Sequence, residues 1–448
     1  MDIDFLKDIE KKYDVQQIKC NQIPIWAVLR IYLFDSVQTN KKVSINRYIF
    51  IHLLKSLFYY NPLLFFRKSD VWIFSSSGER VLYGNKYINR IFGGIVSCVR
   101  HSLTIETPVN RNHCPKSKIT EKRIVSMSIL YLFTYIFSLF IKNKKYKIER
   151  EDILQNILQD YSLKFDYNVI INRLLAQYFS LKLLLKIFPE PKLVFMNCPY
   201  TLMGYVYAFK KRKIKVVEMQ HGVVNDKHYA YNSLIVNRDL LPDYFVVYGN
   251  YERHIFETNN KCYVSIDKII LAGSYILDLY KTKTVTDIFE MFRKKYKKII
   301  VVSGQDFYEQ LIIDFINDVA QVDVKNYYVY IPRKNKNCLH LANNVGYCSH
   351  INIYDAIKCA DIHSTINSTT CKESHYLGVK NVFIDIDGLS KLYYGDVFKE
   401  GIDAYYARTP AQYISCIGQI DKLVIGDTNY FYIEGHLERI KKFINSNI

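Results

Sequence analysis

The sequence predicts an α/β protein in which two Rossmann-like, doubly wound domains face a cleft, with a helical N-terminal region. Three observations support this class. The chain has 448 residues, which exceeds the usual size of a single hydrophobic core. From about residue 190, short apolar segments typical of strands alternate with helical segments, as in parallel βαβ units. A polar and basic stretch, residues 281–296, separates this alternation into two runs. We therefore expect an N-terminal domain over residues 1–280 and a C-terminal domain over residues 297–448.

The two runs can be assigned element by element from their apolar periodicity. In the first run, the expected strands are 192–197, 214–219, 244–248 and 268–272, and the expected helices are 201–212 and 251–257. In the second run, the expected strands are 298–303, 327–332, 361–365 and 381–385, and the expected helices are 308–319, 354–359, 370–377 and 430–444. Each run has the pattern of a parallel sheet with helices on its faces.

The N-terminal third is helical in pattern and rich in aromatic residues. Residues 124–141 contain no charge and lie between Arg123 and Lys142, so their length just reaches that of a membrane-spanning helix. Hydroxyl side chains interrupt the run, and a span would separate residues 1–120 from the rest of what looks like one domain. We interpret it as a buried or interfacial helix, with the spanning helix as the alternative.

The chain is strongly basic, with 61 Lys and Arg against 43 Asp and Glu, a formal net charge of +18. We expect no nucleic-acid partner, because no zinc-finger, RNP-like or basic-zipper pattern is present. Basic clusters beside aromatic runs favour an anionic inner-membrane surface, and a solvated basic face is the alternative. The charged N-terminus has no apolar segment of a signal peptide, and the ten cysteines form no CxxC pair. We expect a cytoplasmic protein, peripheral on the inner membrane.

The first candidate site follows the predicted strand 214–219. His221 and Gly222 come at the end of this strand, where ligands bind in open parallel sheets. A neutral imidazole can accept a proton from an attacking hydroxyl, so His221 is the leading candidate for a catalytic base. Glu218 could orient the ring of His221, and His228 is a second candidate. The alternative is that His221 only caps a turn.

The second candidate site is the loop that begins with Gly304 and Gln305 after the strand 298–303. Backbone N–H groups in such a loop can bind phosphate. Neither a GxxxxGK[ST] nor a GxGxxG motif occurs in the chain, so the sequence favours neither ATP-driven phosphotransfer nor ordinary dinucleotide chemistry. Arg333 and Lys334, at the end of the strand 327–332, could add positive charge to the same phosphates.

The third candidate site lies at the start of the helix expected over 370–377. The hydroxyls of Ser368, Thr369 and Thr370 suit a diphosphate, and Glu373 could hydrogen-bond ribose hydroxyls. Thr370 and Glu373 also match a capping box, which is the structural alternative. The string 385–387 matches D-x-D but ends a buried-looking strand, so we expect no metal there and no cofactor.

Three stretches carry a resemblance to a known family: EMQHGVVNDKHYAY at 218–231, a strand ending in YG at 248–249, and IYDAIKCADIHSTINSTTCKE at 353–373. Together they resemble the capsular and lipopolysaccharide glycosyltransferases of GT-B fold. The resemblance covers roughly residues 190–400. It is looser in the N-terminal third, where it rests on NQIPIWAVLR and TIETP. Where relatives often read Lys-x-His-Pro, this chain reads Tyr-Ile-Pro-Arg-Lys, ending in Arg333 and Lys334.

The resemblance implies a metal-independent transferase that uses a nucleotide-sugar donor and a lipid-linked or glycan acceptor. Residues from 281 onward would hold the donor nucleotide, and the N-terminal half would hold the acceptor and supply the base. The function expected is transfer of a sugar to a growing capsule or O-antigen. The alternatives are a polyol-phosphate transferase of the teichoic acid type, a sugar epimerase, and a non-catalytic membrane-associated scaffold. If His221 is not the base, His228 and Glu106 are the next candidates.

Overall fold

The computed structural model describes residues 3–39, 56–109, 112–142, 146–225, 228–259, 263–333 and 340–448. Contacts within the chain divide it into two compact units. The first unit is Met1–Tyr275 together with Gly435–Ile448, and the second unit is Ile276–Glu434. Each unit contains one large parallel sheet, which confirms the prediction of two separate Rossmann-like sheets. The cleft expected between the two domains stays a prediction.

The large sheet of the first unit has seven strands in the order β12-β11-β10-β9-β3-β6-β7, all of them parallel. These strands are β3 (Val71–Ser76), β6 (Ser102–Thr107), β7 (Ile124–Ser126), β9 (Leu193–Met196), β10 (Lys215–Met219), β11 (Tyr244–Val247) and β12 (Ile269–Leu271). The α/β alternation therefore begins at residue 71, well before residue 190. Sequence periodicity missed β3, β6 and β7 because a short hairpin, β4 (Arg80–Tyr83) and β5 (Lys86–Asn89), and only one short helix separate β3 from β6, and because the apolar run of β7 continues directly into a helix.

Both faces of this sheet are apolar, as in parallel sheets generally. Because successive side chains of a strand point to opposite faces, Trp72 and Phe74 pack beneath α7 (Tyr167–Ile187) and α8 (Met203–Lys211). Val71 and Ile73 pack on the opposite side, against α4 (Gly93–Cys98) and α17 (His436–Asn445). Helix α9 (Asn250–Asn259) follows β11, and α10 (Tyr275–Thr282) leads into the second unit.

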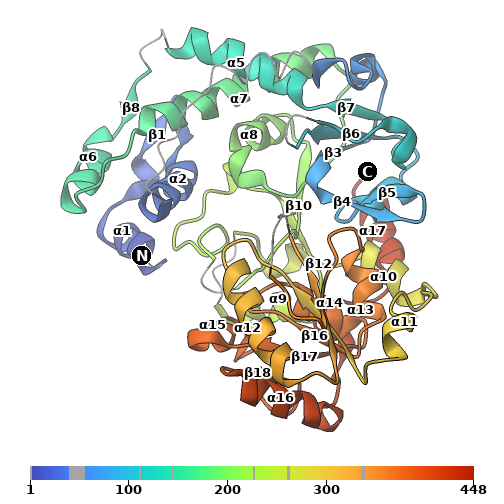
Figure 1. Ribbon diagram of the computed structural model, residues 1–448. Helices are drawn as coiled ribbons and strands as arrows, with labels where there is room; N and C mark the ends of the chain where they lie inside the picture. Colours follow the sequence, from blue (N-terminus) through green and yellow to red (C-terminus); the bar gives the residue numbers. More distant parts are fainter. Residues whose placement is uncertain are drawn as a thin grey trace. The chain divides into compact units, whose positions relative to one another are not determined.

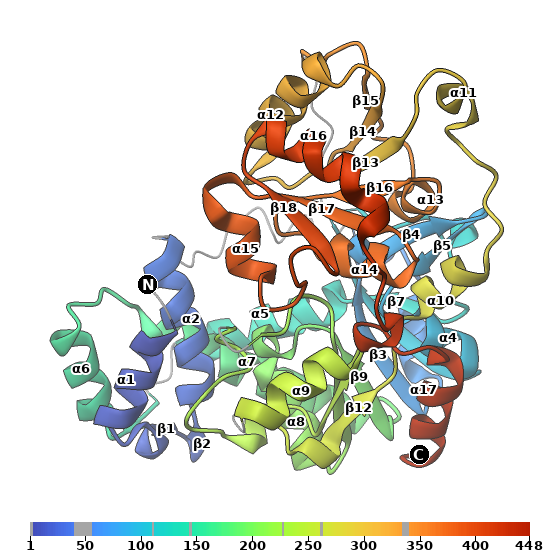
Figure 2. The ribbon, with the colours of Figure 1, turned by 90° about the horizontal axis from the view of Figure 1, so that it is seen from below.

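The last helix, α17, corrects the predicted domain boundaries. It belongs to the first unit, where it packs against α4 (Figure 2), and not to a domain 297–448. Its apolar residues Ile440, Phe443 and Ile444 cover one face of the first sheet. The two helices come so close that a Cβ atom on Gly94 would lie 2.3 Å from the ring of His436. The other boundary falls between residues 275 and 276.

The uncharged run 124–141 forms β7 and then α5 (Ser128–Lys142), not one 18-residue helix. Helix α5 lies along α7 (Figure 1), and the hydroxyl of Thr134 is 3.0 Å from that of Ser180 and 2.7 Å from that of Tyr205. All four hydroxyl residues in the run have structural partners: Thr134 as described, Ser128 at 2.5 Å from Ser56, Ser126 at 2.9 Å from Nε2 of His113, and Ser138 at 2.7 Å from the carbonyl of Tyr135. Among the helices in the described part of the chain, none is long and apolar enough to cross a membrane.

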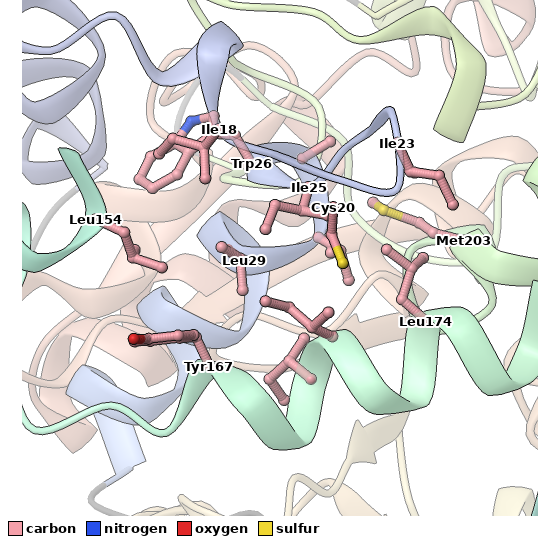
Figure 3. Close-up of a cluster of buried hydrophobic side chains, with 14 of the residues drawn as sticks. Ile18, Cys20, Ile23, Ile25, Trp26, Leu29, Leu154, Tyr167, Leu174 and Met203 are labelled. Carbon is pink, nitrogen blue, oxygen red and sulfur yellow. The ribbon is translucent and has the colours of Figure 1, made fainter. Parts of the chain in front are cut away.

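A second hydrophobic cluster lies under the N-terminal helices (Figure 3). It is built from α1 (Asp4–Lys12), α2 (Trp26–Thr39), α6 (Glu151–Asp160) and the first half of α7. A small antiparallel sheet of β1 (Lys19–Cys20), β2 (Ile23–Pro24) and β8 (Ile148–Glu149) closes one side of it. Trp26, Leu29 and Leu174 pack together here, as the close-up shows. The predicted helical N-terminal region is therefore present, with its own core.

A buried ion pair joins this helical region to the loop after β10. Glu10 and Arg30 lie 2.8 Å apart, with side chains 0% and 3% exposed respectively. The guanidinium of Arg30 also donates to the carbonyl of Asn232 at 3.0 Å, and Glu10 accepts from the backbone N–H of Leu234 at 2.9 Å. The pair therefore ties α1 and α2 to the segment that follows His228.

The large sheet of the second unit has six parallel strands in the order β15-β14-β13-β16-β17-β18. They are β13 (Ile299–Ser303), β14 (Tyr327–Ile331), β15 (Val345–Tyr347), β16 (Ile362–Ser364), β17 (Lys380–Ile384) and β18 (Ala404–Ala407). This is the strand order of a Rossmann fold. The sequence located four of the six strands, and missed the short or tyrosine-rich edge strands β15 and β18.

Helices cover both faces of the second sheet. Helices α12 (Glu309–Val322) and α16 (Pro410–Gln419) lie next to each other on one face (Figure 2), and α13 (Ile353–Lys358) packs on the other. The remaining helices of this unit are α11 (Glu290–Arg293), α14 (Thr370–Tyr376) and α15 (Leu389–Tyr394). Because helices cover both faces of the sheet, the ends of its strands stay uncovered.

We predict that Arg30→Met lowers the free energy of unfolding by about 3–5 kcal/mol, because it leaves the Glu10 carboxylate buried without its partner. Urea unfolding followed by far-UV circular dichroism measures the change. As a control, Arg253→Met breaks the exposed pair Arg253–Glu257, and should change stability by no more than about 0.5 kcal/mol. If the two substitutions changed the free energy of unfolding equally, the prediction that the buried pair stabilises the fold more than the exposed pair would be wrong.

Candidate functional site

In each sheet, two neighbouring strands are followed by connections that run in opposite directions, and this place is the topological switch point. In open parallel sheets, ligands bind in the crevice at this point, beyond the carboxyl ends of the strands. In the first unit, this switch point lies between β3 and β9. In the second unit, it lies between β13 and β16. The residues that follow these strands and their neighbours are therefore the ones to consider as a site.

His221 follows β10, the strand beside β9. Its Nε2 atom is 3.2 Å from the hydroxyl of Tyr200, which comes from the loop after β9. Burial lowers the pKa of His221 below its usual value; the charge of Glu79 opposes this decrease, and the charge of Arg90 adds to it. Its Nδ1 atom is buried and makes no hydrogen bond within the described structure. His221 is thus a neutral imidazole near pH 7, in the protonation state that a general base requires.

The loop after β3 lies within electrostatic range of His221, and the sequence reasoning missed it. Glu79 in this loop pairs with Arg90 at 2.7 Å, and both side chains influence the pKa of His221. The loop reads Ser76-Ser77-Gly78 directly after a buried apolar strand. That succession of an apolar strand and a Ser/Gly turn is the signal that could have located it.

Glu218 does not orient the ring of His221 as predicted. Its side chain, in a residue only 1% exposed, accepts hydrogen bonds from the hydroxyls of Tyr231, at 2.9 Å, and Tyr263. Burial raises the pKa of Glu218 to about 8, and the two tyrosine hydrogen bonds oppose this rise. Glu218 therefore holds the loop that carries Tyr231 to the body of the unit.

His228 has structural partners on several sides. Its ring stacks on Tyr229 with a centroid distance of 5.3 Å and lies 4.7 Å from the ring of Tyr231. The N–H of Ala230 donates to its Nδ1 atom at 3.2 Å. Burial, together with a smaller effect of the nearby His221, lowers its pKa to about 4. The ring of His228 is thus packed against Tyr229 and Tyr231, and we keep it as the second candidate for the base.

Glu106, the remaining candidate for the base, is fully buried in a polar network. It accepts from the hydroxyl of Ser77 at 2.8 Å and from Arg80 at 2.7 Å, and Arg80 also pairs with Glu121 at 2.9 Å. Burial alone would raise the pKa of Glu106, but hydrogen bonds from His113 and Ser77 and the charge of Arg80 lower it. A carboxylate held in this way anchors the loop after β3 and is a poor proton acceptor.

In the second unit, Gly304 fits closely against β14. A Cβ atom at this position would lie 2.5 Å from the Tyr330 hydroxyl and 2.9 Å from the carbonyl oxygen of Ile331. The N–H of Gly304 donates to that carbonyl at 2.8 Å. The amide predicted to bind phosphate therefore already has a partner, and the role of Gly304 is to let the loop approach the strand.

Gln305 joins the two loops at the switch point of the second unit. Its Oε1 atom accepts from the N–H of Asn367 at 3.0 Å and from the hydroxyl of Thr365 at 3.2 Å, and its amide group donates to the side chain of Asn367. Gln305 thus sets the spacing between the loop after β13 and the loop after β16. Asn367 was not predicted as a site residue, although it directly precedes Ser368 in the quoted motif.

Buried side chains of β13, β16 and β17 are connected by hydrogen bonds. The hydroxyl of Ser303 lies 2.8 Å from Nε2 of His363, and Nδ1 of His363 lies 2.8 Å from Oδ1 of Asn381. Burial lowers the pKa of His363 to about 4, so the ring is neutral near pH 7. These hydrogen bonds link the carboxyl end of β13 and the middle of β16 to the amino end of β17.

Ser368, Thr369, Thr370 and Glu373 gather at the start of α14, as predicted. The capping box, which was the structural alternative, is not formed, because the N-cap is Thr369 and its side chain makes no capping bond. Instead, the Ser368 hydroxyl accepts from the N–H of Thr370 at 3.3 Å. The Thr370 hydroxyl is buried and makes no hydrogen bond within the described residues. Contact of these side chains with a diphosphate or ribose stays a prediction.

The remaining predicted positions are Arg333, Lys334 and the D-x-D string at 385–387. Arg333 is exposed, two residues after the end of β14, and Lys334 lies outside the described residues. Asp385 of the D-x-D string accepts from the N–H of Lys391 at 2.9 Å and from Arg408 at 3.2 Å. Over the ranges that the structure describes, no cluster of His, Cys, Asp and Glu could hold a metal ion.

No protein-family model matches the chain, and no curated protein matches it. Solved structures do. A Listeria monocytogenes protein assigned as a UDP-N-acetylglucosamine 2-epimerase is similar over 85% of this chain and 96% of that one, at 9% identity and a TM-score of 0.51. S. aureus MnaA, solved with UDP, is similar over 85% of this chain and 97% of that one, at 12% identity and a TM-score of 0.51.

The fold is GT-B-like. At these identities the likeness concerns the fold alone, and it agrees with the two Rossmann-like sheets described above. The GT-B fold implied by the sequence resemblance is thereby confirmed. A glycosyltransferase of kitacinnamycin is also similar over 85% of this chain and all of that one, at 10% identity, but its TM-score of 0.49 is too low to carry an argument.

We predict that Glu218→Gln makes stability less dependent on pH. The folded chain holds the Glu218 proton up to about pH 8, whereas the unfolded chain releases it near its ordinary pKa of about 4.3. The stabilisation from this proton is therefore complete below about pH 4.3, and is lost as the pH rises toward 8. The glutamine cannot titrate, so the decrease in stability between pH 5 and pH 8 should be smaller.

Urea midpoints at pH 5 and pH 8 measure this difference. Glu257→Gln serves as the matched control, since Glu257 is an exposed carboxylate on α9 and should leave the pH dependence of the wild type nearly unchanged. Parallel pH profiles for the wild type and Glu218→Gln would contradict the elevated pKa.

Proposed function

We propose that this chain is a glycosyltransferase that moves a sugar from a nucleotide-activated donor to a growing bacterial surface polysaccharide. The observation that carries the proposal is a neutral, half-buried histidine at the carboxyl edge of the first sheet. His221 accepts the proton of the attacking acceptor hydroxyl, which is a poor nucleophile near pH 7. A base in this position typically contributes a factor of about 10² to 10⁴ in rate.

The second unit is proposed to hold the donor nucleotide in the crevice between β13 and β16. Support comes from its Rossmann strand order, because nucleotides bind such sheets at the switch point. The similar fold of S. aureus MnaA was solved with UDP, which favours a uridine nucleotide as the first donor to try. Ser368 and Thr369 would contact the diphosphate, and Glu373 the ribose. Gln305 would position the two loops.

The acceptor is proposed to be lipid-linked or a growing glycan. The resemblance of residues 218–231 and 353–373 to capsular and lipopolysaccharide glycosyltransferases supports this choice. The charge of +18 favours a place at the anionic cytoplasmic surface of the membrane, where lipid-linked acceptors are presented. A leaving diphosphate can be neutralised by backbone dipoles and basic side chains, so the proposal needs no metal ion.

An epimerase is the second candidate, because the proteins of similar fold include ones assigned as UDP-N-acetylglucosamine 2-epimerases. The surroundings of His221 favour transfer. Glu106 and Glu218, the acids of strands β6 and β10, are both occupied by structural partners. A single imidazole, that of His221, suits the removal of one proton from an acceptor. An epimerase acts on the donor alone, and therefore turns it over without any acceptor.

We predict that His221→Ala lowers turnover at least about a hundredfold while nucleotide-sugar affinity is retained. The assay incubates the chain with labelled nucleotide sugars or labelled nucleotide-polyols, with and without lipid-linked acceptor. His101→Ala is the matched control, since His101 lies exposed in a turn. Near-normal turnover in a folded His221→Ala protein would remove His221 as the base. Conversion of donor without acceptor would favour the epimerase, and use of nucleotide-polyols would favour the polyol-phosphate transferase.

We also predict that Gln305→Ala and Ser368→Ala weaken donor binding. A thermal-shift screen against nucleotides and nucleotide sugars identifies the donor, which should stabilise the wild type by about 2.7 kcal/mol at a hundredfold excess over Kd. Loss of Gln305 frees two loops, and loss of Ser368 removes one hydroxyl, so Gln305→Ala should have the larger effect. Gln310→Ala, exposed on α12, is the control. Unchanged shifts in both variants would place the donor elsewhere.

A further inference from the structure

Three neighbouring segments of the first unit are basic and contain no acidic residue. They are residues 56–68, helix α5 and helix α7, and we call the surface that they form the α5–α7 face. Their basic residues are Arg67, Lys68, Lys142, Arg173, Lys182 and Lys186. These six charges equal a third of the formal net charge of +18. This face therefore carries a share of the positive charge that no acidic residue of the same segments offsets.

The charges of this face are not neutralised by the protein itself. All but Arg173 belong to exposed residues. Within the described residues, none of the six forms an ion pair with an acidic side chain. An unneutralised basic surface attracts anionic partners over about one Debye length.

The same face exposes large apolar side chains, which water does not favour. Phe58 is 76% exposed, Leu63 66%, Phe66 56% and Phe140 66%. Further exposed apolar residues on α5 and α7 are Ile136, Leu139, Leu183 and Ile187. These elements already bury a different apolar side against the first sheet. A helix that is apolar on both its inner and outer sides is typical of contact with lipid or with another protein.

The three segments form one continuous surface. Helices α5 and α7 lie side by side (Figure 1), and Asn172 of α7 donates to the carbonyl of Ser138 at 3.2 Å. At the other end of α7, the ring of Phe188 is 5.0 Å from the ring of Phe66. The apolar and basic side chains therefore stand on neighbouring elements of one unit.

We propose that the α5–α7 face binds the surface of an anionic phospholipid bilayer, with its exposed apolar side chains in the headgroup region and its Lys and Arg side chains against the lipid phosphates. The pairing of basic and apolar residues along α7 supports this occupant. Lys182 is followed by Leu183, and Lys186 by Ile187, one turn further along the same side of the helix. Helix α5 has 15 residues and spans about 22 Å, less than the hydrocarbon core, so it lies along the surface.

The test uses the full chain with vesicles of phosphatidylglycerol in phosphatidylcholine, and with vesicles of phosphatidylcholine alone. Lys182→Gln/Lys186→Gln should lower binding to the anionic vesicles about tenfold at low salt. Phe58→Ser/Phe140→Ser should lower it as well, and this loss should persist at high salt. Because all four residues are exposed, these variants should unfold at the wild-type temperature. Lys441→Gln/Lys442→Gln on α17 removes the same charge elsewhere, and should change binding by no more than about twofold.

The proposal requires that the lysine variant and the phenylalanine variant both bind anionic vesicles more weakly than the wild type, and that the α17 variant binds them nearly as well. It is overturned if the wild type does not bind anionic vesicles, if the α17 variant loses as much binding as the α7 variant, or if either the lysine or the phenylalanine variant binds normally. Conversion of an oligomer to monomers by Phe58→Ser/Phe140→Ser, with vesicle binding unchanged, would instead identify a contact between copies of the chain. Vesicle binding needs neither donor nor acceptor, so the result is independent of the proposed enzymatic function.

Discussion

Parallel pairing of every strand in the two large sheets determines where the rest of the chain can lie. A parallel strand must be followed by a crossover, and crossovers place helices on both faces, so both faces must be apolar. Helices leave the ends of the strands uncovered, and the carboxyl ends of all strands lie on the same side of such a sheet. This is why residues far apart in sequence, such as Tyr200 and His221 or Gln305 and Asn367, come together. Because both faces of the first sheet must be covered, α17 packs on this sheet although it follows the second unit in sequence.

Buried polar contacts then fix the loops at these strand ends. Arg80 and Glu106 hold the loop after β3, Glu10 and Arg30 hold the segment after His228, and Glu218 holds Tyr231. Each contact joins elements that a hydrophobic core alone would leave free to slide, since apolar packing has little directional preference. Such contacts are costly to break once formed, because a single partner left behind is buried without compensation.

This arrangement separates structural carboxylates from the group available for chemistry. Glu106 and Glu218 are nearly inaccessible and have hydrogen-bond partners, whereas one buried nitrogen of His221 makes no hydrogen bond to any residue that the structure describes. Burial keeps that imidazole neutral, and a neutral ring is the form that can take a proton. The basic and apolar α5–α7 face belongs to the same compact unit as His221, so the proposed base and the proposed membrane contact are carried by one unit.

The sequence by itself determined the class of fold, most of the strands after residue 190, and the position of His221 at a strand end. Apolar segments of strand length alternating with helical ones are enough for this, because local periodicity reflects burial. Only the tertiary structure decided the rest. Periodicity did not reveal β3, β6 and β7 across their long connections, nor the return of α17. Nor could it show that the oxygens of Glu218 face two tyrosines instead of His221, or that the amide of Gly304 is occupied. These facts depend on which segments become neighbours in space, and a local pattern carries no information about contacts between distant parts of the chain.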